Sequence, residues 1–157
     1  MYIAEIRIEN FRSFGAGEHA FKLTLQPGLT ALVGENNAGK TTVIDALRYV
    51  LGTRDQEQLR IDEVDFHRSA SGDIAEQITI RLVFRGLTTA DRGAFAEFLT
   101  YETVQGTLQT CLVLAWTAKR PVSGSRRASS PEWRTGAKGD GPLLDFGARS
   151  LLTATYL

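Results

Sequence analysis

The chain of 157 residues has few of the residues on which several classes of small protein depend. A single cysteine, Cys111, excludes an internal disulfide and a zinc site built from cysteines. Only two histidines are present, far apart in the sequence, which disfavours a histidine-rich metal site. The longest apolar run, residues 111–116, is far shorter than the roughly 20 residues of a membrane-spanning helix. We therefore expect no contact with a membrane.

The sequence also lacks an excess of either charge. Eighteen lysines and arginines balance eighteen aspartates and glutamates, which disfavours a protein that coats nucleic acid through overall positive charge but allows a local basic patch. Apolar residues make up 43% and charged residues 23%, and both values are typical of a soluble globular domain. Because charges interrupt the N-terminal residues where a signal peptide needs its apolar stretch, we expect a cytoplasmic protein.

Hydrophobic periodicity predicts an α/β domain. Alternation predicts strands at residues 2–8, 20–25 and 76–84, and the apolar content of residues 107–117 predicts a further, central strand. The apolar run 29–33 predicts a further strand that is buried on both faces, with the 2–8 and 20–25 strands paired antiparallel beside it. Apolar residues at three- and four-residue spacing predict a helix from about Thr41 to Leu51, with Gly52 as its stop, and a shorter helix over 89–101.

A glycine-containing loop lies between the 29–33 run and the first helix. Its sequence, Gly34-Glu35-Asn36-Asn37-Ala38-Gly39-Lys40-Thr41, fits the phosphate-loop pattern G-x-x-x-x-G-K-[ST] at every fixed position. The glycines allow backbone N–H groups to turn toward phosphate oxygens, and a helix N-terminus adds partial positive charge. Lys40 is expected to contact the β- and γ-phosphates of a nucleotide, and the hydroxyl of Thr41 to bind Mg²⁺. The alternative is a glycine turn that caps a helix, with Lys40 in solvent.

The residues on both sides of the loop resemble one group of ATPases. The opening Ile6-Arg7-Ile8-Glu9-Asn10-Phe11-Arg12-Ser13-Phe14 and the stretch from the loop to Arg48 resemble the ABC-type ATPases that act on DNA, namely RecF, the structural-maintenance-of-chromosomes (SMC) proteins and the double-strand-break repair ATPases. The Asn36-Asn37-Ala38-Gly39 form, with residues 63–67 and 151–157, resembles most closely the OLD (overcoming lysogenization defect) family of ATP-dependent nucleases.

This resemblance implies a fold and a division of the chain. Residues 1–118 would form the N-terminal lobe of an ABC-type ATPase, a mixed sheet with helices around a phosphate loop. Residues 119–147 would insert a loop or hairpin, and residues 148–157 would begin a helix. The implied cofactors are ATP and Mg²⁺, and the implied partners are DNA and a second copy of the lobe in a homodimer. The implied nucleotide-binding residues are Arg12, Gly34, Glu35, Asn36, Asn37, Ala38, Gly39, Lys40, Thr41 and Thr42, with Thr41 at the metal.

Three parts of an ABC-type ATPase are not recognisable: the signature motif, the acidic pair of the Walker B strand and the switch histidine. We therefore expect the chain to be a piece of a longer protein and catalytically incomplete alone, and no catalytic residue is assigned. Two functions fit the resemblance. One is an ATPase lobe that powers or controls DNA processing in an OLD-type nuclease; the other is a RecF- or SMC-like clamp without nuclease activity. A GTPase or kinase is disfavoured because no N-K-x-D motif follows the loop.

Two further clusters admit two interpretations each. The basic residues Arg126, Arg127, Arg134 and Lys138, with Trp133 between them, resemble a nucleic-acid patch or a solvated hairpin. Asp62, Glu63 and Asp65 resemble a metal cluster, but a polar loop is favoured because no fourth ligand or required glycine accompanies them.

Overall fold

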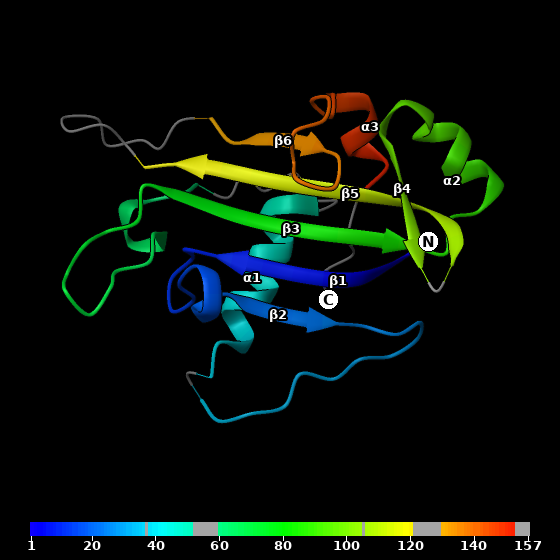
Figure 1. The fold of residues 1–157 in the computed structure, drawn as a ribbon. Helices are drawn as coiled ribbons and strands as arrows, with labels where there is room; N and C mark the ends of the chain where they lie inside the picture. The colour runs from blue at the N-terminus through cyan, green and yellow to red at the C-terminus, as the bar shows by residue number, and fades with distance from the viewer. Residues whose placement is uncertain (37, 52–59, 105, 121–129, 153–157) are drawn as a thin grey trace.

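The computed structural model describes residues 1–36, 38–51, 60–104, 106–120 and 130–152, and its centre is a six-stranded sheet (Figure 1). The order across the sheet is β2-β1-β3-β5-β4, and β6 pairs with β5. The pairings in the described part of the chain are antiparallel. The strands are β1 (Tyr2–Glu9), β2 (Phe21–Thr24), β3 (Gln77–Arg85), β4 (Leu99–Val104), β5 (Thr107–Lys119) and β6 (Glu132–Thr135).

Helix α1 (Lys40–Leu51) lies across one face of this sheet, which we call the inner face; the opposite side is the outer face (Figure 1). Two shorter helices are α2 (Thr89–Ala94) and α3 (Phe146–Ser150). Single 3₁₀ turns occur at η1 (Gly17–His19), η2 (Glu63–Asp65) and η3 (Ala96–Phe98). None of the helices in these ranges has the length and apolar character that a bilayer crossing requires.

The core forms where alternating strand residues meet the apolar side of α1. On α1, Val43, Ala46 and Val50 are buried at three- and four-residue spacing, as the periodicity requires. Burying a side chain as large as valine contributes about 1.5–3 kcal/mol, and such burial is the main source of stability. The strand residues that face α1 in the same cluster are Ile6, Ile8, Ile78, Ile80, Leu82, Leu112, Leu114 and Trp116.

Several expected elements are confirmed. β1 and β2 pair antiparallel, with Ile8 opposite Phe21, and β5 is a central strand between β3 and β4. The helix after the glycine loop forms and begins at Lys40. Cys111 lies in the core of β5, where burial, with a smaller contribution from the nearby Glu102 carboxylate, raises the pKa of its thiol to about 11.

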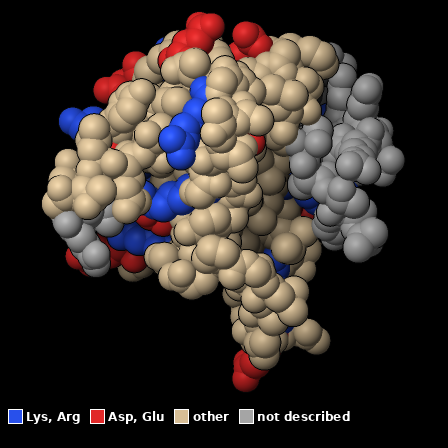
Figure 2. Space-filling view, turned by 90° about the vertical axis from the view of Figure 1, so that its right-hand side faces the viewer, with Lys and Arg blue, Asp and Glu red and all other residues tan. Residues whose placement is uncertain are grey.

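The strand predicted over residues 29–33 is wrong. Leu29 is 100% exposed and Val33 is 92% exposed. The segment between β2 and α1 projects below the sheet in Figure 1 and is the narrow extension at the bottom of Figure 2. A strand exists only where a neighbour binds its N–H and C=O groups, and no strand within the described ranges pairs with this run. The apolar composition of residues 29–33 therefore predicts a segment that needs a neighbouring strand, but it does not show whether such a strand is present.

The helix predicted over residues 89–101 is shorter than expected. Thr88 caps α2, since its side chain accepts a hydrogen bond from Asp91 N at 3.1 Å, and the Asp91 carboxylate accepts one from Thr88 N. After Ala94 the chain turns through η3, and Leu99 pairs with Leu112 in the β4–β5 ladder. Pairing with a central strand thus ends the helical stretch early.

Candidate nucleotide-binding site

Helix α1 starts directly after the glycine loop, and Gly39 is the residue that allows this. Its φ of +86° lies in the left-handed region, which favours glycine. Its carbonyl oxygen accepts the first helical hydrogen bond, from Val43 N at 3.0 Å. The N–H groups of the first turn then have no acceptor within the helix and give this end a partial positive charge. This is the local geometry that binds phosphate groups.

The side chain of Lys40 turns back into the loop. Its ammonium donates to the carbonyl oxygen of Gly34 at 2.5 Å and to that of Glu35 at 2.7 Å. A nucleotide phosphate at this position would compete with the two carbonyl oxygens for the ammonium. Of the two motif glycines, Gly39 has the expected left-handed backbone, whereas Gly34 does not.

The remaining predicted nucleotide-binding residues of the loop differ in their exposure to solvent. Glu35, Asn36 and Ala38 are exposed, as is Thr41, so its hydroxyl is accessible to a ligand. Thr42 is buried, so any contact with phosphate would come from its backbone N–H. Asn37 lies outside the described residues. A role in nucleotide binding therefore stays a prediction for each of these residues.

The N-terminal motif packs against the phosphate loop through Phe14. Its ring would lie 2.7 Å from a Cβ atom built on Gly39, and it stacks on Phe21 with 4.8 Å between ring centroids. The two motifs that the sequence singled out, far apart in the chain, are therefore in contact.

This contact predicts the result of replacing Gly39. We expect Gly39→Ala to weaken nucleotide binding and to lower the free energy of unfolding by about 2 kcal/mol or more, because a left-handed alanine costs about 1–2 kcal/mol before the clash with Phe14 is added. Gly17→Ala is the matched control, since Gly17 also has a left-handed φ, +60°, but has nothing within 4 Å of the new Cβ. Urea unfolding measures both. Equal losses of stability in the two variants would contradict the packing role of Phe14.

Arg12 lies between two carboxylates instead of facing the glycine loop. Its Nε donates to Asp65 at 2.9 Å and its terminal nitrogen to Asp45 at 2.5 Å. Asp45 stands on α1 five residues after Lys40, about 7.5 Å farther along the helix axis. Burial lowers the pKa of Arg12, but the hydrogen bonds to Asp45 and Asp65 outweigh it, so the pKa is raised above its ordinary value.

The backbone around Arg12 is fixed as firmly as its side chain. Arg12 has a left-handed φ of +50°, and its N–H donates to the carbonyl oxygen of Asp65 at 2.8 Å. Nδ1 of His67 lies 2.8 Å from the carbonyl oxygen of Arg12, which can only accept, so the ring donates there. A phosphate contact by Arg12 would require the guanidinium to leave a carboxylate, and this role stays a prediction.

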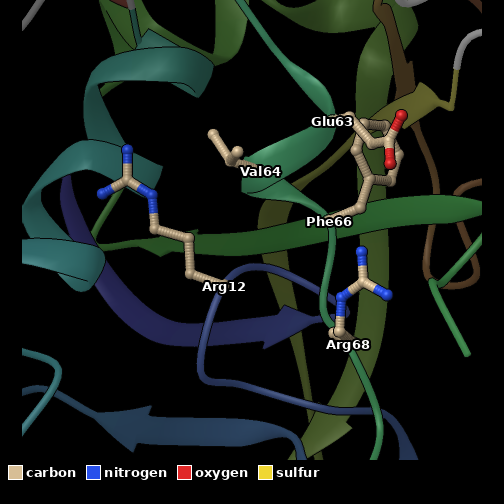
Figure 3. A pocket seen from close by; sticks show the side chains of 5 residues that line it. All are labelled: Arg12, Glu63, Val64, Phe66 and Arg68. Atoms are coloured by element: carbon tan, nitrogen blue, oxygen red, sulfur yellow. The ribbon is translucent and has the colours of Figure 1, made fainter. Parts of the chain in front are cut away.

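A pocket of about 520 Å³ opens beside this cluster, lined by Arg12, Glu63, Val64, Phe66 and Arg68 (Figure 3). Arg12 extends toward α1, away from Arg68 and Glu63 (Figure 3). The terminal nitrogen of Arg68 donates to the carbonyl oxygen of Gly72 at 3.0 Å. Because the two guanidinium groups diverge, the pocket does not present a single site for an anion.

The acidic residues next to this pocket have structural partners. Asp62 and Asp65 form the capping box of η2, in which Asp62 N donates to the Asp65 carboxylate at 3.1 Å. Asp65 also forms an ion pair with Arg12, so the negative charge of its carboxylate is already balanced. Among the residues that the structure places, no group of three or more histidine, cysteine or acidic side chains is arranged to hold a metal ion.

Of the two interpretations of the basic cluster, the nucleic-acid patch, which the sequence favours less than a solvated hairpin, does not form with Trp133 beside Arg134. Trp133 lies opposite Trp116 on the inner face, and its indole N–H donates to the carbonyl oxygen of Val50 at 2.9 Å. Arg134 lies opposite Ala115 and faces the outer side. Adjacent residues in a strand point to opposite faces of the sheet, so Trp133 and Arg134 cannot share a surface. The amino-acid composition of this segment does not show that it forms a strand. Arg126 and Arg127 lie outside the described residues.

Comparison with known proteins gives chromosome partition proteins among the relatives of this chain. The chain is 40% identical over 65 residues to the chromosome partition protein Smc of Chlorobaculum tepidum, which covers 41% of this chain and 5% of that protein. It is 33% identical over 101 residues to Smc of Xanthomonas oryzae pv. oryzae, which covers 62% of this chain and 8% of that protein. The chain therefore spans less than a tenth of the length of these relatives.

Solved structures share the fold. A structure from a study of ATP-driven dimerization and DNA-stimulated activation of SMC ATPases has a TM-score of 0.63 at 19% identity, covering 97% of this chain and 77% of that one. The SmcHead bound to the C-winged helix domain of ScpA has a TM-score of 0.62 at 17% identity, covering 97% and 40%. The α/β fold expected for an ABC-type ATPase lobe is thereby confirmed.

The family itself is given by a sequence match. The pattern of the AAA domain family matches residues 5–128, which include most of β1, the glycine loop, α1, β3 and all of β5. These residues also contain the contact between Phe14 and Gly39 and the cluster around Arg12. With more than half of its length in this match, the chain belongs to the AAA domain family.

Proposed function

We propose that this chain is the nucleotide-binding N-terminal part of a RecF- or SMC-like ATPase that binds ATP with Mg²⁺ and acts on DNA. The observation that carries the proposal is the glycine loop at the start of α1, with Lys40 turned into the loop and Phe14 of the N-terminal motif packed on Gly39. The Smc relatives and the family match support the same kind of protein.

Each residue has a chemical role in this proposal. Backbone N–H groups at the start of α1 bind phosphate oxygens, and the ammonium of Lys40 exchanges the Gly34 and Glu35 carbonyl oxygens for the β- and γ-phosphates. The hydroxyl of Thr41 would hold Mg²⁺, which would supply positive charge against the phosphates. Hydrolysis also needs a group that orients the attacking water, and the sequence has no recognisable Walker B pair for it. Binding, without efficient turnover, is thus the activity proposed for these 157 residues.

The proposed partners are DNA and a second ATPase lobe. A structure with the same fold comes from work on ATP-driven dimerization and DNA-stimulated activation of SMC ATPases, which supports both partners for the full-length protein. In such a dimer, the phosphate loop of one copy and the signature motif of the other would enclose the nucleotide.

A second candidate is the ATPase lobe of an OLD-type nuclease. The Asn36-Asn37-Ala38-Gly39 form of the loop and residues 63–67 favour it. The two candidates differ in the region C-terminal to the lobe. An OLD-type nuclease would carry a Toprim domain with an acidic metal site there, whereas an SMC- or RecF-like protein would carry a long coiled coil or a lid. The two relatives described above are Smc proteins, so we rank the SMC-like function first.

Binding of ATP with and without Mg²⁺ tests the proposal. We expect Mg²⁺ to strengthen ATP binding to the parental chain and Thr41→Ala to remove most of this gain, about tenfold, which corresponds to about 1.4 kcal/mol for one lost ligand. Thr24→Ala, an exposed threonine on β2, is the control and should keep the full gain. Titration calorimetry gives both affinities. A Thr41→Ala chain that still gains as much from Mg²⁺ as the parental chain would overturn the metal assignment.

A further inference from the structure

The outer face of the sheet carries basic side chains from four strands, aligned across the sheet. In the register of the sheet, Lys22 of β2 lies opposite Arg7 of β1, and Arg7 lies opposite Arg81 of β3. Arg81 is opposite Ala115 of β5, which is opposite Arg134 of β6. Directly opposed residues point to the same face, so these side chains form one line. We call Lys22, Arg7, Arg81 and Arg134 the basic row.

The basic row is long and narrow. Neighbouring strands lie about 4.8 Å apart, so the row extends across four strand spacings, about 19 Å. On one side it is flanked by Glu9, Thr79, Thr117 and Glu132, and on the other by Thr24, Glu5, Val83 and Val113. The acidic residues beside it confine the positive charge to a line.

The gap at Ala115 is bridged by the turn after β6. A Cβ atom on Gly139 would lie 2.7 Å from the Cβ of Ala115, so this turn covers Ala115 closely. Nε of Arg81 donates to the carbonyl oxygen of Ala137 at 3.2 Å, and a terminal nitrogen of Arg134 donates to that of Gly141 at 3.4 Å. The same turn therefore orients both arginines, leaving further N–H groups of each for a ligand.

The stability of the sheet does not account for this arrangement. Like charges that lie directly opposite in neighbouring strands are destabilising, and Lys22, Arg7 and Arg81 are three in succession. Arg7 pairs with Glu9 and Arg134 with Glu132, whereas no carboxylate in the described part of the chain pairs with Lys22 or Arg81. Two positive charges thus remain for an external partner.

We propose that the basic row binds the phosphate backbone of duplex DNA. A line of cations fits a linear polyanion, and duplex DNA carries about one negative charge per 1.7 Å of its axis. Arginine guanidinium groups suit phosphate oxygens because they donate two parallel hydrogen bonds. Single strands are bound mainly by stacking on aromatic rings, but no aromatic residue stands in the row or in its two flanking lines, since Trp133 faces inward.

This inference rests on the proposed function only for its choice of DNA. The row lies on the outer face of the sheet, whereas α1, whose first turn forms the phosphate end, covers the inner face. DNA binding by the row should therefore be measurable without nucleotide and should survive Lys40→Ala. A chain that binds DNA through the basic row but does not bind ATP would contradict the proposed function and support this inference. A chain that binds ATP but does not bind DNA through the basic row would contradict this inference and leave the proposed function unaffected.

The test is fluorescence anisotropy of a labelled 20-base-pair duplex with the 157-residue chain over a series of salt concentrations. Arg81→Gln and Lys22→Gln are each expected to weaken binding about tenfold at low salt and to reduce the slope of log affinity against log salt by about 0.9. Arg68→Gln, which removes the same charge from the segment beside the pocket, should change neither quantity. The melting temperature of Lys22→Gln should not fall, because this variant relieves repulsion between opposed charges without loss of a hydrogen bond to the turn after β6.

Three outcomes would overturn the proposal. The first is a salt slope in Arg81→Gln and Lys22→Gln equal to that of the parental chain. The second is a loss of affinity in Arg68→Gln as large as in the row variants, which would place DNA at the pocket. The third is tighter binding of a single-stranded oligonucleotide than of the duplex, which would indicate a stacking surface elsewhere.

Discussion

Replacing Lys40 with alanine is expected to abolish ATP hydrolysis in the full-length protein and to weaken ATP binding by this chain at least a hundredfold. Hydrogen bonds to charged groups are worth about 1.5–3 kcal/mol each, and two phosphates would lose such a bond. The ammonium already bridges the carbonyl oxygens of Gly34 and Glu35, so its removal also takes away the contacts that close the loop over the start of α1. Titration calorimetry with Mg-ATP measures the affinity.

The control for this variant is Lys22→Ala. It removes the same charge from an exposed lysine on β2 and should leave ATP affinity unchanged. Circular dichroism of both variants establishes that each is folded. If the Lys40→Ala chain binds ATP as tightly as the Lys22→Ala chain, the glycine loop is a helix cap and no phosphate site.

Replacing Arg12 with alanine is expected to lower the free energy of unfolding by about 2–3 kcal/mol. Removing one partner of a fully buried ion pair costs about 3–5 kcal/mol, and the partial exposure of Arg12 reduces this value. The Asp65 side chain is only 7% exposed, and without Arg12 it retains the hydroxyl of Tyr49 at 3.4 Å and the N–H of Asp62. An uncompensated carboxylate would then remain between α1 and the 62–67 segment.

Arg7→Ala is the matched control for Arg12→Ala. Arg7 also pairs with a carboxylate, Glu9, but on the outer face, where a surface pair contributes at most about 1 kcal/mol. Urea unfolding at neutral pH gives both free energies, and ATP titration of the folded variants shows whether Arg12 has a second role at the phosphates. Equal stability of the two variants would mean that the two aspartates do not depend on Arg12.

Local patterns predicted the elements whose stabilising contacts follow from local spacing. β1 and most of β3 alternate because one face of each is buried, whereas the middle of β5 is apolar throughout because both of its faces are buried there. α1 repeats its apolar residues because one stripe faces the sheet. The glycine–lysine spacing of the loop predicted the start of α1, including the left-handed backbone of Gly39. These features depend on periods of two and 3.6 residues, which a single sequence displays directly.

The features that the sequence did not predict depend on distant partners. Arg12 meets Asp45 and Asp65, which are 33 and 53 residues away, and no spacing rule connects them. The apolar run 29–33 matches a buried strand, yet burial requires neighbours on both sides, and composition says nothing about which segments provide them. The basic row was hidden for the same reason, because its four residues come from four strands and only the register aligns them.

The strand order has a consequence for folding of the chain during its synthesis on the ribosome. Ile8 of β1 can meet Phe21 soon after both emerge, but its other neighbour, Ile80, is made 72 residues later. At synthesis rates of about 5–20 residues per second, this edge of β1 waits roughly 4–14 seconds for β3, and the apolar stripe of α1, which is made later, waits for a shorter time. During that interval the nascent chain presents an unpaired strand edge beside an uncovered amphipathic helix, which is the kind of surface that chaperones bind. Completion of the lobe is therefore set by the arrival of its middle strands, and the phosphate loop is synthesised before β3 and β5, which complete the sheet.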